Sequence, residues 1–150
     1  SLRKSGLAEA LRLRANEKVP ILGICLGMQL LFDSSEEGVE TGLGLIPGVV
    51  RRLPVDTPEG PVRIPHMGWS RIEQPRPHGL TEGIGEEARF YFVHSYVVVP
   101  KDNNDIIGVS TYGCQFVSAV ARKNVLGVQF HPEKSHRYGK TLLGNFLRAF

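Results

Sequence analysis

Cysteine is scarce in this sequence, long apolar runs are absent, and neither sign of charge dominates. The two cysteines, Cys25 and Cys114, are too few for a disulfide framework and do not form a Cys-x-x-Cys pair. No apolar stretch approaches the roughly 20 residues that a membrane-spanning helix needs, and residues 1–18 are charged and amphipathic, unlike a secretory signal. The net charge of +3 comes from scattered side chains, which does not indicate a nucleic-acid surface. We therefore expect a cytoplasmic protein that binds neither membranes nor nucleic acid.

Cofactor motifs are also missing. The glycine-punctuated segment 42–48 has neither the Lys-Ser/Thr of a P-loop nor the spacing of a dinucleotide fingerprint. We expect no cofactor and no metal in the site.

A chain of 150 residues can form one domain with a sizeable core, and no repeat or composition shift divides it, so we expect a single domain over 1–150. Apolar spacing predicts helices over about 5–16 and 139–150. Runs of β-branched and aromatic residues predict strands over 19–24, 49–53, 88–99, 106–112, 115–122 and 125–129. The pattern favours an α/β fold, with an open, mostly parallel sheet flanked by helices and extended by antiparallel strands.

A strand-to-helix turn occupies the centre of this prediction. The short apolar run 19–24 is typical of a buried strand, and from Leu26 onward Leu26, Leu30 and Asp33 share one helical face. Cys25 therefore lies between a strand and a helix. This arrangement matches the nucleophile elbow, with cysteine in place of serine.

The elbow predicts both a geometry and a chemical state. Gly23 and Gly27 should be required sterically, because the turn brings the strand and helix backbones close together. The helix N-terminus should favour the thiolate of Cys25 over the thiol. A packed, inert cysteine is the alternative that this motif alone leaves open.

A nucleophilic cysteine needs a base and a group that orients the base. Among the five histidines, His131 directly follows the apolar strand 125–129 and Phe130, at the strand end where sites of α/β proteins cluster. Glu133, two residues later, could hold its imidazole. His66 and His94 lie among aromatic residues, which is more typical of packing or hydrogen bonding than of a base.

Five segments carry a family resemblance: Gly23-Ile24-Cys25-Leu26-Gly27-Met28-Gln29-Leu30-Leu31-Phe32, Gly42-Leu43-Gly44, Pro65-His66-Met67-Gly68-Trp69, Tyr91-Phe92-Val93-His94-Ser95-Tyr96 and Gly127-Val128-Gln129-Phe130-His131-Pro132-Glu133-Lys134-Ser135. With them, the sequence resembles the class I (triad) glutamine amidotransferases over essentially its whole length. Within that class it is similar to the glutaminase subunits of imidazole glycerol phosphate synthase, which act in histidine biosynthesis.

The resemblance implies a mechanism. Cys25 would attack the carboxamide carbon of glutamine, and His131, supported by Glu133, would move the proton from the thiol to departing ammonia. A γ-glutamyl thioester would remain for hydrolysis to glutamate. By resemblance, the substrate pocket would be formed by Gly27, Gln29, His94, Ser95 and Tyr96.

The resemblance also implies a partner. Ammonia would pass to a (β/α)8-barrel synthase subunit in a heterodimer, and Trp69 and Lys134 match positions near that interface. The sequence leaves two alternatives open. One is a glutaminase serving another amidotransfer pathway, and the other is an inactive binding domain.

The start of the sequence departs from the family pattern. Family members carry further strands and a glycine-containing oxyanion loop ahead of the elbow strand, whereas here one helix precedes it and Ser1 is not a methionine. We expect an N-terminally truncated chain that is a weak or inactive glutaminase alone, because a lost oxyanion donor typically costs about a hundredfold or more in rate. An exposed sheet edge would also favour a homodimer.

Overall fold

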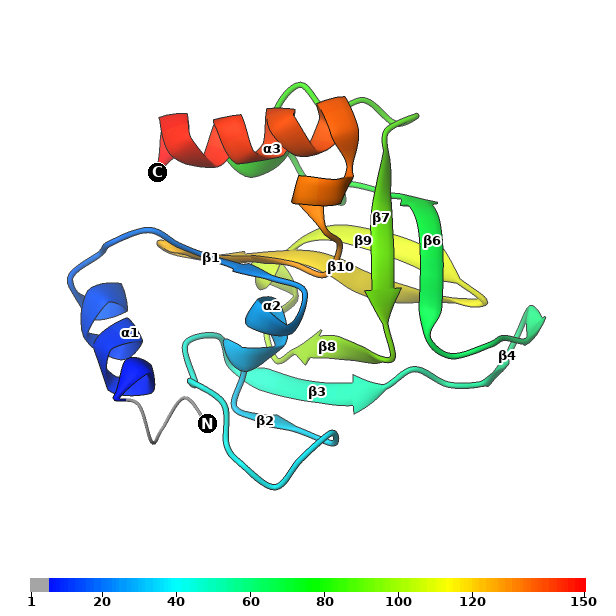
Figure 1. The fold of residues 1–150 in the computed structure, drawn as a ribbon, viewed down its shortest axis with the longest axis horizontal. Helices are drawn as coiled ribbons and strands as arrows, with labels where there is room; N and C mark the ends of the chain where they lie inside the picture. The colour runs from blue at the N-terminus through cyan, green and yellow to red at the C-terminus, as the bar shows by residue number, and fades with distance from the viewer. Residues whose placement is uncertain (1–5) are drawn as a thin grey trace.

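A mixed seven-stranded sheet runs through the middle of the protein, in a computed structural model that describes residues 6–150 (Figure 1). The helices are α1 (Leu7–Asn16), α2 (Leu26–Leu30) and α3 (His136–Ala149), with short 3-10 turns η1 (Gly79–Thr81), η2 (Asn103–Asp105) and η3 (Pro132–Lys134). The strands are β1 (Ile21–Ile24), β2 (Ser34–Ser35), β3 (Gly48–Arg52), β4 (Asp56–Thr57), β5 (Gly60–Pro61), β6 (His66–Arg71), β7 (Arg89–His94), β8 (Tyr96–Pro100), β9 (Ile106–Tyr112), β10 (Cys114–Arg122) and β11 (Val125–Val128).

The sheet order is β1-β11-β10-β8-β3-β2, with β9 paired to β10 beside this path. β1 runs parallel to β11 with Ile24 opposite Val128, and β2 runs parallel to β3. The other strand pairs of this sheet are antiparallel. The predicted α/β fold with added antiparallel strands is thus confirmed, and the parallel pair β1–β11 is the one that carries the elbow.

Side chains that alternate along the strands fill two cores, one on each face of the sheet. On β11, Leu126 and Val128 belong to the core beneath α3, while Val125 belongs to the core beneath α1 and α2. In Figure 1, α3 lies on one side of β1, and α1 and α2 lie on the other. The site at the end of β1 and β11 is therefore supported from both faces.

Helix α1 confirms the predicted helix, but its buried stripe differs from the leucine pattern. Ala8 and Ala15 are buried, whereas Leu7 is 47 % exposed and Leu13 is 56 % exposed. The small side chains at positions 8 and 15 let the helix approach the sheet closely, and Leu11 is partly buried against the same core. Leu2, which the sequence pattern included, lies outside the described residues.

The predicted strand 88–99 is in fact two strands. β7 ends at His94 and pairs with β6 in a separate two-stranded ribbon, and β8 begins at Tyr96 in the main sheet. Ser95 lies at the break, and its carbonyl accepts a hydrogen bond from the N–H of Leu53 at 2.9 Å. The propensity of each residue for a strand could not reveal this change of sheet, because both halves are equally rich in aromatic and β-branched residues.

The C-terminal helix begins at His136, three residues before the predicted start, and buries Leu142 and leaves Leu147 81 % exposed. Within residues 6–150, none of the helices has both the length and the apolar character needed to cross a membrane.

Candidate active site

Cys25 occupies a strained backbone conformation at the turn between β1 and α2. Its φ is 52° and its ψ is −109°, a region that non-glycine residues rarely adopt. The N–H of Cys25 donates to the carbonyl of Val128 at 2.8 Å, which extends the parallel pairing of β1 and β11 by one bond. This hydrogen bond fixes Cys25 at the carboxyl end of the parallel pair, as the elbow prediction requires.

The two glycines beside Cys25 differ in their steric role. A Cβ on Gly23 would lie 2.6 Å from the carbonyl oxygen of Gly27 and 2.8 Å from the nitrogen of Met28, so only glycine fits there. A Cβ on Gly27 would meet nothing within 4 Å. The steric expectation is therefore confirmed for Gly23 and wrong for Gly27, because the close approach involves the backbone of Gly27 and not its Cα hydrogens.

Helix α2 is only five residues long, and its buried side chains are Met28 and Gln29. Leu26 is 56 % exposed, so the predicted apolar face at Leu26 and Leu30 does not face the core. Asp33 lies beyond the helix and accepts a hydrogen bond from the N–H of Gly48 at 2.9 Å. The helix ends early because the chain turns at Leu31 and Phe32 to bury both side chains against the sheet.

His131 lies just past the end of β11, beside the elbow. Its Nδ1 is 2.6 Å from Oε1 of Glu133, the residue predicted to orient it. Its Nε2 is buried without a hydrogen-bond partner in the described structure. On the backbone, the N–H of His131 donates to the carbonyl of Tyr91 at 2.8 Å, and Ser135 Oγ donates to the carbonyl of His131 at 2.6 Å. The imidazole is thus oriented at one nitrogen and free to accept a proton at the other.

Burial is the largest effect on the sulfur and raises the pKa of the Cys25 thiol above its ordinary value. The N–H of Leu26 and the amide of Gln129 lower it, the charge of Glu133 raises it further, and Lys134 lowers it. The expectation of a resting thiolate is therefore wrong, because desolvation outweighs the N–H group of the short helix. A thiol that must lose its proton during attack depends on a neighbouring base.

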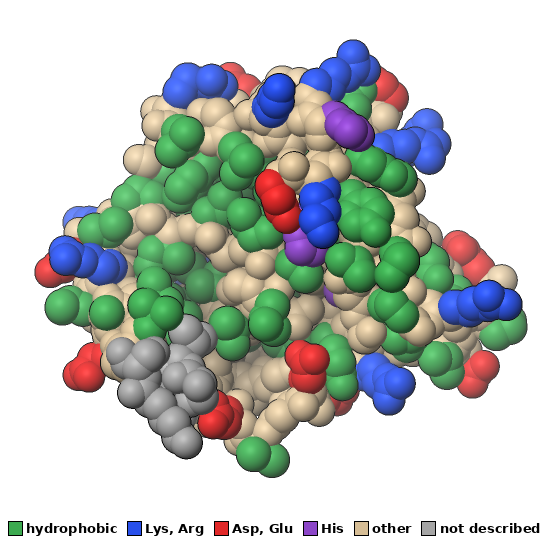
Figure 2. Space-filling model, viewed as in Figure 1, with side chains coloured by type: hydrophobic (Ala, Val, Ile, Leu, Met, Phe, Trp, Pro, Cys, Tyr) green, Lys and Arg blue, Asp and Glu red, His purple; other side chains and the backbone are tan. Residues whose placement is uncertain are grey.

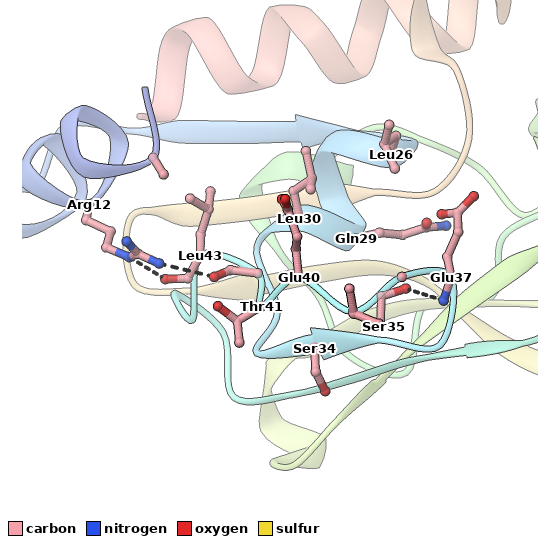
Figure 3. A pocket seen from close by; sticks show the side chains of 14 residues that line it. Arg12, Leu26, Gln29, Leu30, Ser34, Ser35, Glu37, Glu40, Thr41 and Leu43 are labelled. Carbon is pink, nitrogen blue, oxygen red and sulfur yellow. Dashed lines mark hydrogen bonds between the residues drawn. The ribbon is translucent and has the colours of Figure 1, made fainter. Parts of the chain in front are cut away.

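A cavity of about 580 Å³ opens next to the elbow, between α1, α2 and the loop 37–43 (Figure 3). Leu26, Gln29 and Glu37 are among the residues that line it. Arg12 reaches from α1 to the loop, where its Nε donates to the carbonyl of Leu43 at 2.9 Å and its Nη2 donates to the carbonyl of Gly42 at 3.1 Å (Figure 3). These two bonds tie the wall of the cavity to α1.

The predicted pocket residues are placed differently from one another. Gln29 lines the cavity, but its Nε2 donates inward to the carbonyl of Tyr96 at 3.1 Å and to Oε1 of Gln129 at 3.0 Å. His94 is only 6 % exposed and packs between aromatic rings, and its Nδ1 is 2.9 Å from the carbonyl of Tyr96. Gly27 and Ser95 are half-buried near the elbow and at the β7–β8 break. Of the predicted pocket residues, Gln29 lines the cavity, whereas Gly27, His94, Ser95 and Tyr96 are not among its lining residues.

The predicted partner-contact residues form one exposed group. Trp69 is 43 % exposed, its ring stacks on His136 with centroids 5.4 Å apart, and it meets Tyr91 edge-on at 5.6 Å. The Nζ of Lys134 lies 5.8 Å from the centroid of the Tyr91 ring. Trp69 and Lys134, which are 65 residues apart in the sequence, thus flank the same tyrosine beside His131.

Two polar residues of the site were missed by sequence reasoning. Gln129 is fully buried, and its Nε2 lies 3.8 Å from the sulfur of Cys25. Glu37 lines the cavity with Gln29. The position of Gln129, two residues before His131 on a strand end, was an available signal, whereas Glu37 lies in a polar loop that resembles any solvated turn. Within residues 6–150, His, Cys, Asp and Glu nowhere gather in a group able to hold a metal ion.

The family model for class-I glutamine amidotransferases matches residues 3–150. Imidazole glycerol phosphate synthase subunit HisH of Nitrosospira multiformis is 52% identical over 151 residues, which cover 98% of this chain and 70% of that protein. The HisH subunit of Moorella thermoacetica is 48% identical over 147 residues, covering 97% of this chain and 68% of that protein.

Solved structures of lower identity share the fold. The structure of PurLQS from Thermotoga maritima superposes with a TM-score of 0.72 at 18% identity, covering 95% of this chain and 68% of that chain. A glutamine amidotransferase from Thermotoga maritima superposes with a TM-score of 0.62 at 16% identity, covering 95% of this chain and 53% of that chain. The match to the family model over nearly the whole sequence, together with relatives about half identical, places this chain in the class-I glutamine amidotransferase family.

Proposed function

We propose that this chain hydrolyses glutamine with a Cys25–His131–Glu133 triad and supplies the ammonia to a synthase subunit of histidine biosynthesis. One observation carries the proposal. His131 is bound at Nδ1 by Glu133 at 2.6 Å and keeps a buried, unpartnered Nε2 at the end of the strand that runs parallel to the elbow strand of Cys25. The names of the close relatives support the pathway.

The first half of the reaction forms a thioester. The sulfur of Cys25 attacks the carboxamide carbon of glutamine while its proton moves to Nε2 of His131, and Glu133 stabilises the imidazolium. The tetrahedral intermediate then collapses: the C–N bond breaks, and His131 returns the proton to the leaving nitrogen as ammonia departs. The raised pKa of the Cys25 thiol makes this proton transfer part of the attack and not a step that precedes it.

The second half restores the enzyme. Water attacks the thioester carbon while His131 accepts a proton from it, the C–S bond breaks, and the proton returns to the sulfur as glutamate leaves. The N–H of Leu26, the residue after the nucleophile, is the oxyanion donor that this chain contributes in both halves.

The cavity next to the elbow suits an amino-acid substrate. Its walls combine apolar side chains such as Leu26 and Leu30 with polar and charged ones, and the carboxylates of Glu37 and Glu40 suit the α-ammonium group of glutamine. We assign Gly27, Gln29, Ser95 and Tyr96 to this pocket or its support, and place His94 in its support.

A (β/α)8-barrel synthase subunit is the proposed partner, and the exposed group around Trp69 and Lys134 is its proposed contact. An exposed Trp beside a cation and two further aromatic rings has the composition of an interaction hot spot. We further propose that the chain acts in the cytoplasm, as one domain over 1–150.

Self-association is a second proposed interaction. β1 is an edge strand of the sheet in the described residues, and Val19 just before it is 41 % exposed. Figure 2 shows hydrophobic side chains gathered on the side of the molecule where Figure 1 places α1, β1 and α3. Exposed edges and apolar patches favour pairing with a second copy. Sedimentation at increasing concentration tests this, and a monomer throughout would contradict it.

Labelling with a glutamine-analogue electrophile tests the glutaminase proposal, because it needs an assembled pocket and nucleophile but not rapid turnover. We expect one adduct per chain, on Cys25, and protection by glutamine. Cys25→Ser should abolish the adduct and Cys114→Ser should leave it unchanged. Labelling at Cys114 alone, or labelling that glutamine does not slow, would contradict the proposal.

The pathway is tested separately with glutamate release in the presence of the barrel subunit from histidine biosynthesis. Stimulation that is lost in Trp69→Ala and Lys134→Ala supports the proposed partner. Stimulation only by a synthase of another pathway would leave the glutaminase chemistry standing and reject the assignment to histidine biosynthesis.

A further inference from the structure

Two buried amide side chains lie directly beneath the nucleophile. Gln129 is fully buried and Gln29 is 8 % exposed. The Nε2 of Gln29 lies 3.0 Å from Oε1 of Gln129, and the Nε2 of Gln129 lies 3.8 Å from the sulfur of Cys25. Buried amides without partners are costly, so their orientation is decided by which donors and acceptors surround them.

A backbone carbonyl fixes the orientation of Gln29. The carbonyl of Tyr96 can only accept, so the group of Gln29 that lies 3.1 Å from it must be the NH₂. The second N–H of the same NH₂ donates to Gln129, which must then present its oxygen to Gln29. The NH₂ of Gln129 is thereby left facing the sulfur of Cys25.

The same carbonyl fixes two histidine tautomers. His94 Nδ1 lies 2.9 Å from the carbonyl of Tyr96 and must carry the proton, so His94 Nε2 is an acceptor. His66 Nδ1, 3.0 Å from that nitrogen, is then a donor, and His66 Nε2 accepts from Ser70 Oγ at 3.0 Å. Burial lowers the pKa of each of the two histidines to about 4, which keeps both rings neutral at pH 7.

Every hydrogen bond in this series has a single direction. The series, here called the polar chain, consists of Ser70, His66, His94, Tyr96, Gln29 and Gln129. Turning the amide of Gln129 over would set its NH₂ against the NH₂ of Gln29 and its oxygen against the sulfur. The contact between the two NH₂ groups would be unfavourable, so the polar chain holds one orientation only.

We propose that Gln129 is a catalytic residue whose amide N–H donates to the sulfur of Cys25 as negative charge develops there, and that the rest of the polar chain positions this N–H. A hydrogen bond to a charged acceptor is stronger than one to a neutral acceptor, so the bond tightens when the thiol loses its proton. The role in turnover rests on the proposed glutaminase function, but the role toward the sulfur does not.

The pH dependence of Cys25 alkylation by iodoacetamide, followed by peptide mass spectrometry to separate Cys25 from Cys114, tests the contact with the sulfur. Gln129→Met keeps the length of the side chain and removes the donor. We expect the midpoint of alkylation to move to higher pH by about one unit. The titratable groups near the sulfur, His131, Glu133 and Lys134, are unchanged in this variant.

Gln129→Glu keeps the shape of the side chain and serves if Gln129→Met does not fold. It replaces the donor with an oxygen, so we expect the midpoint of alkylation to rise at least as far.

His66→Phe preserves the aromatic stacking but leaves His94 Nε2 without its donor, and we expect a smaller rise of the midpoint in the same direction. Ser110→Ala is the matched control, because it removes a buried 2.9 Å bond to Ser118 outside the polar chain. We expect no change there.

Glutamate release is measured on the same variants, and we expect kcat to fall about tenfold in Gln129→Met with a smaller change in KM. A midpoint that is unchanged in both Gln129 variants, or that moves equally in Ser110→Ala, would overturn the proposal. If the midpoint moves as expected but the wild-type chain and its partner complex release no glutamate, the glutaminase proposal fails and the contact with the sulfur stands.

Discussion

His131 and the His66–His94 pair place the same imidazole group in opposite environments. His131 is bound at one nitrogen by a half-exposed carboxylate, and its other nitrogen has no hydrogen-bond partner among residues 6–150. His66 and His94 are 2 % and 6 % exposed, lie among the rings of Phe92 and Phe116, and bond at both nitrogens. A nitrogen without a hydrogen-bond partner can accept a proton, whereas a ring bonded at both nitrogens holds its neighbours in place.

The difference comes from what surrounds each histidine. His131 follows the end of β11, where the chain leaves the sheet. His66 and His94 also lie at strand ends, but they are opposite each other on β6 and β7 and are buried among aromatic rings. Burial and hydrogen-bond partners, and not residue type, thus separate the two kinds of histidine.

Replacing His131 or His94 by alanine should give the largest effects, one on activity and the other on stability. His131→Ala should lower glutamate release at least a thousandfold, as for other triad bases, while the free energy of unfolding changes by less than about 1 kcal/mol. His94→Ala should do the reverse. It should cost about 3 kcal/mol of stability through a core cavity and an unpaired His66, with an activity loss of only about tenfold.

Glutamate release and urea unfolding on both proteins measure the two quantities. A similar loss of stability in the two variants would show that His131 is also a packing residue. A similar loss of activity would remove the distinction between base and support.

Acid should act on the buried pair through stability. The folded pKa values of His66 and His94, about 4, lie below the ordinary unfolded value, so the unfolded chain binds more protons between pH 6.5 and 4. The stabilisation is fully present above about pH 6.5 and is lost as pH falls toward 4, by on the order of 3 kcal/mol for one histidine. Burial also lowers the pKa of His78, which adds in the same direction.

Unfolding in urea at several pH values between 7 and 4.5 measures this slope. In His66→Phe, which keeps a ring between Phe92 and Tyr112, the slope should be shallower. A slope equal to that of the unsubstituted protein would mean that other groups dominate its acid sensitivity.

The smallest expected effect concerns the partner of His131. Glu133→Gln keeps a hydrogen-bond acceptor 2.6 Å from Nδ1 but removes the negative charge that stabilises the imidazolium. We expect glutamate release to fall about 10- to 100-fold, with the stability unchanged within about 0.5 kcal/mol because the carboxylate is half-exposed. The charge of Glu133 also raises the pKa of the Cys25 thiol, so its removal acts on the sulfur as well as on the imidazole. Full activity in this variant would show that orientation alone suffices.

Local patterns predicted much of the fold and its centre. The strand 106–112 matches β9 residue for residue, and the helix over 5–16 contains α1. The elbow at Cys25 is formed by a few consecutive residues, and so is the His131–Glu133 pair. Short-range backbone geometry is therefore enough to recognise each of them. The prediction was wrong where distant segments compete, as in the continuous strand over 88–99 and in the buried face of α1.

The sequence by itself determined the family and the chemical groups: the motifs around Cys25 and His131 depend on residue order alone and match a known class. Only the tertiary structure decided the thiol state of Cys25, the free space at Gly27 and the place of Gln129 against the sulfur. These properties depend on desolvation, steric contact and hydrogen-bond direction. All three are set by atoms that approach only when β1, β8 and β11 come together in one sheet.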